Sequence, residues 1–134
     1  MTTSRKPKDE SRPLPLAGIR VVDLGWVWSV PVIGQFLAEM GAEVIKVESS
    51  TQLDLSRRGP PIGDRPGHPD WIIGFHTRHR NKLGVTINLR TEEGKDLIKR
   101  LIAVSDVVME NMTAGAIKRL GLGYEELRKI RPDL

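Results

Sequence analysis

The stretch from Leu16 to Glu48 constrains the fold of this chain more than any other part of the sequence. Residues 19–24 are apolar and β-branched, which is typical of a buried strand, and residues 43–48 form a second short segment of this kind. Gly41 stands where the end of a helix favours a left-handed residue. Strand, helix and strand at this spacing predict a βαβ unit. The helix, over residues 31–40, should bury the apolar positions Val32, Ile33, Phe36, Leu37 and Met40.

The alternation of strand and helix patterns continues to the end of the chain. Residues 84–89 predict a third strand, residues 91–103 a helix capped by Thr91, and residues 106–110 a fourth strand. Two short helices are expected at 114–120 and 124–130, and one helical turn at 71–75 inside the long, proline- and glycine-rich segment 49–80. The helix at 91–103 should bury Leu97, Ile98, Leu101 and Ile102. We therefore expect an α/β fold with parallel strands that continues beyond residue 134.

Composition narrows the class of protein. The chain has 134 residues, a net charge of +4 and no cysteine, and it lacks both a signal-peptide core and an apolar run long enough to span a bilayer. These features predict a cytoplasmic domain, or part of one, with no membrane partner. Residues 1–14 look like a disordered tail. Basic residues near 57–82 are not interleaved with aromatic residues, so a phosphate-bearing small molecule is favoured over nucleic acid.

In a parallel α/β fold, ligands bind beyond the carboxyl ends of the strands. The turn at residues 25–30 lies at such a place and carries Trp26 and Trp28, one of which should pack while the other offers a stacking face. It lacks the glycine spacing of a dinucleotide-binding turn, which argues against that site. We predict no metal site, because the histidines at 68, 76 and 79 lie in basic surroundings. The basic run 78–82 is equally compatible with a solvated loop and with phosphate contact.

A series of short motifs resembles the start of the family III CoA-transferases, the CaiB/BaiF group, which also includes the α-methylacyl-CoA racemases. Each motif is weak alone, but they occur in order over nearly everything after the tail. They are PLAGIRVVDL (Pro15–Leu24), VWSVP (Val27–Pro31), LAEMGAEVIKVE (Leu37–Glu48), RNK with GVTINL (Arg80–Lys82, Gly84–Leu89), TEEG (Thr91–Gly94), SDVVMEN (Ser105–Asn111) and RLGLGYEELRKIRPDL (Arg119–Leu134).

The resemblance implies that residues 15–134 are the N-terminal part of a large, Rossmann-like domain that binds CoA. It also implies an acyl-CoA and a carboxylic acid as substrates and an interlocked homodimer. The family's CoA contacts would fall on Val27, Trp28 and Ser29 in the first turn, Ile87 and Arg90 around the third strand, Asn111 and Met112 after the fourth, and Arg119. From its position alone, Arg119 is interpreted as a cation at the end of a helix. The resemblance implies instead that it binds a phosphate of CoA.

The resemblance places the catalytic aspartate, which attacks the acyl-CoA thioester, beyond Leu134, so no residue of this chain is assigned a catalytic role. Asp23, Glu48, Asp106 and Glu110 lie in or at the ends of expected strands and are interpreted as structural. Three readings stay open. They are part of a CoA-transferase, part of an acyl-CoA racemase of the same fold, and a non-catalytic module that binds CoA, a nucleotide or a partner chain.

Overall fold

The fold is built on one parallel sheet. The computed structural model describes residues 13–63 and 68–134, so most of the tail predicted at 1–14 lies outside the described residues. The strands run in the order β3-β2-β1-β4, which confirms the predicted parallel α/β sheet. Their bounds are β1 Arg20–Asp23, β2 Glu43–Glu48, β3 Leu83–Thr86 and β4 Val107–Met109.

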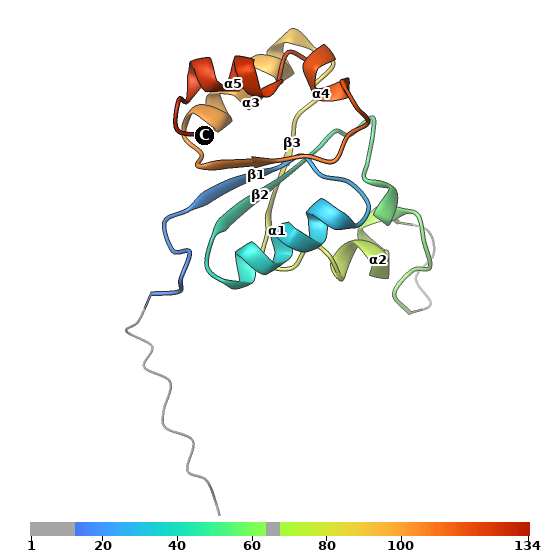
Figure 1. Cartoon of the computed structure of the whole chain (residues 1–134). Helices are drawn as coiled ribbons and strands as arrows, with labels where there is room; N and C mark the ends of the chain where they lie inside the picture. Colours follow the sequence, from blue (N-terminus) through green and yellow to red (C-terminus); the bar gives the residue numbers. More distant parts are fainter. Residues whose placement is uncertain (1–12, 64–67) are drawn as a thin grey trace, which may run out of the picture.

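Helices cover both faces of the sheet (Figure 1). One face carries α1 (Ser29–Glu39) and α2 (Ile73–His76); the other carries α3 (Glu92–Ala103), α4 (Ala116–Arg119) and α5 (Tyr124–Ile130). Short 3-10 turns at Leu55–Arg57 and Pro69–Trp71 lie in the long segment between β2 and β3. None of the helices in the described part of the chain is long and apolar enough to cross a membrane.

Side chains alternate between the two faces of each strand, and this alternation divides the core into two parts, one on each face of the sheet. The face under α3 and α5 is apolar: Val22 of β1 and Leu24, which follows β1, pack there with Ile98 and Ile102 of α3, all at most 1% exposed. The face under α1 is apolar only near the start of the strands, where Val21 and Val44 meet Ala38. Further along the same face, charged side chains replace the apolar ones.

The predicted buried stripe of α1 is wrong at three of its five positions, whereas Val32 and Leu37 are half-buried and Leu37 packs against the core around Val21. The helix buries Val30, Pro31, Gly34, Gln35 and Ala38. It instead exposes Ile33 (50%), Phe36 (57%) and Met40 (42%) to solvent. Gly34 explains the choice of face, because a β-carbon there would lie 2.9 Å from Lys82 Nζ and 3.0 Å from Asp23 Oδ2. Small residues let the helix approach the sheet closely, and a pattern based on large apolar residues alone selects the opposite face.

Other boundaries move by a few residues. β3 ends at Thr86 rather than 89, although the Ile87 backbone N–H still donates to the Glu48 carbonyl at 2.7 Å. In α3, Leu97 is 48% exposed rather than buried, while the predicted cap is confirmed, since Thr91 Oγ1 accepts from the Gly94 backbone N–H at 3.0 Å. The helix predicted at 114–120 is reduced to Ala116–Arg119, and that at 124–130 is confirmed. The predicted left-handed Gly41 is also confirmed, with φ of 101°.

Candidate functional site

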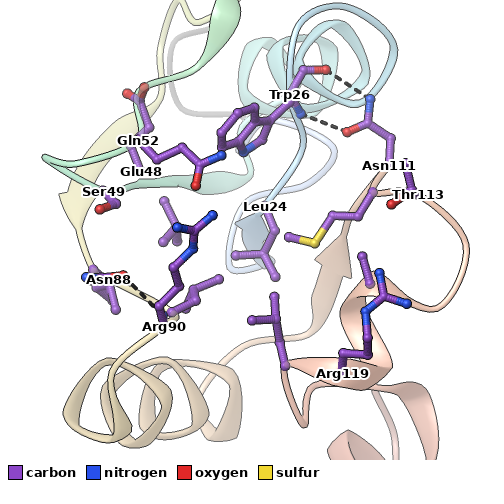
Figure 2. Close-up of a pocket in the computed structure, with 16 residues that line it drawn as sticks. Leu24, Trp26, Glu48, Ser49, Gln52, Asn88, Arg90, Asn111, Thr113 and Arg119 are labelled. Atoms are coloured by element: carbon purple, nitrogen blue, oxygen red, sulfur yellow. Dashed lines mark hydrogen bonds between the residues drawn. The ribbon is translucent and has the colours of Figure 1, made fainter.

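An open pocket of about 570 Å³ lies at the carboxyl ends of the strands, where the topology predicts a ligand site. Its floor is apolar and its rim is polar (Figure 2). The floor is formed by Leu24, Val47, Ile87, Leu89, Met112, Ala116 and Leu120. The rim is formed by Trp26, Glu48, Ser49, Gln52, Asn88, Arg90, Asn111, Thr113 and Arg119.

Two arginines give the rim its charge. Figure 2 shows the side chains of Arg90 and Arg119 extending into the pocket, from the segment before α3 and from α4. Within residues 13–63 and 68–134, neither guanidinium has a carboxylate oxygen within the 4.0 Å of an ion pair. The acidic residue of the rim, Glu48, forms an ion pair with Arg57, whose Nη2 lies 2.7 Å from Glu48 Oε2. The pocket therefore offers two uncompensated positive charges above an apolar floor, an arrangement that suits a phosphorylated ligand with an apolar part.

Asn111 connects the first turn, residues 25–29, to the end of β4. Its Oδ1 accepts from the Trp26 backbone N–H at 2.8 Å, and its Nδ2 donates to the Trp26 carbonyl at 2.9 Å (Figure 2). The same Nδ2 lies 3.2 Å from Ser29 Oγ. This side chain thus fixes Trp26 against the pocket and ties two turns that are far apart in the sequence.

Buried charges hold the same turn from beneath. Asp54 is fully buried and accepts from the backbone N–H of Val27 at 3.0 Å and of Ser56 at 2.8 Å. Lys46 Nζ lies 3.1 Å from Asp54 Oδ2 and donates to the Gly25 carbonyl. Burial opposes ionisation of Asp54, but the Ser56 N–H and the Lys46 ammonium hold its pKa below the usual range. The result is that Val27, a β-branched residue, is kept in a left-handed conformation with φ of 67°.

A second buried pair lies beside the first. Lys82 Nζ is 2.6 Å from Asp23 Oδ2, and both side chains are at most 1% exposed. Burial lowers the pKa of Lys82 although Asp23 opposes the shift. His79, buried against Phe75 at 4.2 Å between ring centroids, is kept neutral: burial and the ammonium groups of Lys82 and Lys46 lower its pKa to about 3. The members of the basic run 78–82 therefore have different surroundings: the side chains of His79 and Lys82 are buried, whereas Arg80 is exposed and pairs with Glu39 at 3.2 Å.

The structure divides the eight predicted CoA contacts into two groups. Ile87, Arg90, Asn111, Met112 and Arg119 line the pocket together. Val27, Trp28 and Ser29 do not line it. Trp26 faces the pocket instead, while Trp28 is 61% exposed and lies under the guanidinium of Arg78.

The acids interpreted as structural have structural partners. Asp23 and Glu48 pair with Lys82 and Arg57, Asp106 accepts from Arg131 at 2.8 Å, and Glu110 accepts from the Met112 backbone N–H at 2.6 Å. No group of three or more potential metal ligands gathers in the described part of the chain. Sequence reasoning missed Asp54, Gln52 and Asn88. Asn88 lies inside the strand predicted at 84–89, as a polar residue near its carboxyl end, which is the signal that could have found it.

Comparison with known proteins gives consistent results. The family model described as CoA-transferase family III matches residues 16–134. The chain is 40% identical over 126 residues to a succinate–glutarate CoA-transferase from Agrobacterium fabrum, covering 92% of this chain and 32% of that protein. It is 41% identical over 122 residues to a succinyl-CoA–D-citramalate CoA-transferase from Chloroflexus aurantiacus, covering 91% of this chain and 29% of that protein.

Solved structures agree with these matches. The crystal structure of a CaiB/BaiF family protein from Brucella suis superimposes with a TM-score of 0.79 and 42% identity, over 89% of this chain and 31% of that one. The chain thus spans about a third of the length of the relatives that it matches.

Proposed function

Because the chain belongs to CoA-transferase family III, we propose that it forms the CoA-binding part of an enzyme that moves CoA between an acyl-CoA thioester and a free carboxylic acid. The observation that carries this proposal is the pocket at the strand ends, with Arg90 and Arg119 uncompensated above an apolar floor. CoA combines phosphates with a long pantetheine arm and so requires both features in one site.

In this proposal, different residues of the pocket contact different parts of CoA. Arg119, assisted by Arg90, binds phosphate oxygens, because a guanidinium pairs with them through parallel hydrogen bonds. Ile87 and Met112 contact the apolar parts of the ligand, and Asn111 holds Trp26 at the rim as a stacking face. In this proposal Val27, Trp28 and Ser29 contact the arm of CoA where it crosses the first turn.

The relatives' names favour the transferase reading over the racemase and the non-catalytic module, because the two described above are both CoA-transferases. Their named acids, succinate, glutarate and citramalate, point to a dicarboxylic acid as the acceptor. The nucleophile is an aspartate outside residues 1–134, so this chain alone should bind CoA without transferring it. We place the enzyme in the cytoplasm as a homodimer.

The test is titration of the 134-residue chain with CoA in a calorimeter. Replacing Arg119 with alanine should weaken CoA binding roughly ten- to hundredfold, because a hydrogen bond to a charged group contributes about 1.5–3 kcal/mol. Arg90→Ala should give a smaller loss. Lys118→Ala, at an exposed cation next in sequence that does not line the pocket, is the control and should bind CoA like the original chain. Unchanged affinity in Arg119→Ala would remove this residue from the site.

A further inference from the structure

Arg78 and Trp28 form a cation–π pair outside the pocket at the strand ends. The guanidinium carbon of Arg78 lies 4.0 Å from the centre of the Trp28 ring, which is 61% exposed. Trp28 belongs to the first turn, and Arg78 follows α2, in the segment between β2 and β3. The pair thus joins the first turn to the segment between β2 and β3, and neither residue lines the pocket that Trp26 borders.

The charge of Arg78 is uncompensated. Nearby cations each have an acid: Lys46 has Asp54, Arg57 has Glu48, Arg80 has Glu39 and Lys82 has Asp23. By contrast, no carboxylate oxygen in the described segments lies within 4.0 Å of the Arg78 guanidinium. Its Nη1 donates to the Gly74 carbonyl at 2.8 Å, and its Nε is buried without a hydrogen-bond partner. Arg58, which also lacks an acid there, is an exposed residue by comparison.

This geometry favours a carboxylate as the missing partner. A guanidinium that lies over the face of an indole ring keeps its N–H groups in its own plane, where they point outward from its edge. A carboxylate can pair with that edge through two parallel hydrogen bonds. The indole also shields one face of the cation from water, which strengthens its attraction for an anion.

We propose that Arg78 and Trp28 bind a carboxylate group of the acid substrate, so that one end of a dicarboxylic acid is held while the other reacts. This inference rests on the proposed function and adds to it the residues that select the acid. The first turn then separates two subsites. Trp26 and Asn111 face CoA, while Trp28 lies between the arm of CoA and the acid, so the thioester end of CoA and the acid meet above the same five residues.

The experiment follows the Trp28 indole N–H signal of the 134-residue chain by nuclear magnetic resonance, with assignment by its loss in Trp28→Phe. Glutarate should shift this signal and saturate, whereas the neutral glutaramide should not. Arg78→Gln should weaken glutarate binding at least about tenfold. Arg78→Lys keeps the charge but loses the planar guanidinium, so its affinity for glutarate should lie between that of the original chain and that of Arg78→Gln. Arg58→Gln is the matched control and should bind glutarate like the original chain.

Parallel titration with CoA separates this inference from the proposed function. Arg78→Gln should keep its CoA affinity within about twofold, which also shows that the variant is folded. Three outcomes would overturn the inference and leave the CoA site intact: the original chain does not bind glutarate, Arg78→Gln binds glutarate with the same affinity as the original chain, or inorganic phosphate binds as well as glutarate does. Loss of CoA affinity in Arg78→Gln without change for glutarate would assign Arg78 to CoA instead. Failure of the original chain to bind CoA would count against the proposed function alone.

Discussion

On the face that carries α3 and α5, the sheet packs against wholly buried isoleucine and leucine side chains, whereas the face under α1 buries two ion pairs and a neutral histidine. The strands themselves make this difference. In β1, Val22 points to the first face and Asp23 to the second, and in β2, Val47 and Lys46 divide in the same way. The apolar face supplies stability, and the charged face holds the first turn, whose Trp26 lines the pocket.

The largest effect on stability is expected when one partner of a buried ion pair on the charged face is removed. Lys82→Met should lower the free energy of unfolding by about 3–5 kcal/mol, because it leaves the carboxylate of Asp23 buried without its partner. The double variant Lys82→Met/Asp23→Asn removes the isolated charge and keeps an oxygen for the Gly25 N–H, so it should recover part of the loss. Urea denaturation measures both. A double variant no more stable than the single one would show that charge is not the cause.

Acidification should also act on the charged face. His79 stays neutral in the folded chain down to about pH 3, while the unfolded chain takes up a proton near pH 6.5. Stability is therefore complete above pH 6.5 and falls towards pH 3, by at most about 1.4 kcal/mol per pH unit. The lowered pKa of Asp54 acts in the same direction below its ordinary value of 3.8. Denaturation at a series of pH values measures how the free energy of unfolding depends on pH. This dependence should be weaker in His79→Gln, whereas His76→Gln, at an exposed histidine, should show the same dependence as the original chain.

A conservative change tests the apolar face. Ile102, which is 0% exposed in the core under α3, should lose about 0.5–1.5 kcal/mol when replaced by valine, through the loss of one buried methylene group. The loss should be independent of pH, in contrast to that of His79. Thermal unfolding at pH 7 and pH 5 distinguishes the two. A pH-dependent cost at Ile102 would mean that the two faces are coupled.

The smallest effect on stability is expected on the outer side of α1. Phe36 is 57% exposed, so Phe36→Gln should change the free energy of unfolding by less than about 0.5 kcal/mol. The same change should reduce self-association of the chain, because Phe36 and Ile33 form part of an exposed apolar surface. Sedimentation velocity measures the association. A loss of stability comparable to that of Ile102→Val would show that this helix buries Phe36 after all.

The sequence allowed the strands, the main helices and the place of the pocket to be predicted, because all three depend on local periodicity and on strand direction. Arg90 and Arg119, which both line the pocket, were identified through the resemblance to the family, because position alone indicates that Arg119 is a cation at a helix end. The buried side of α1 was missed because Gly34 and Ala38 are too small to mark an apolar stripe, although the close approach of the helix to Lys82 requires Gly34. Asp54 was missed because it lies in an irregular segment, where only the tertiary fold brings it to Val27.

The position of β4 in the sheet has a consequence for the order in which the chain folds. β4 pairs with β1, yet Arg20 and its hydrogen-bond partner Asp106 are 86 residues apart. During synthesis at about 5–20 residues per second, β1 therefore waits on the order of 4–17 seconds for that neighbour. β2 emerges much sooner and pairs first. The growing chain must thus keep one side of β1 unpaired for seconds, which is an interval in which a chaperone can act.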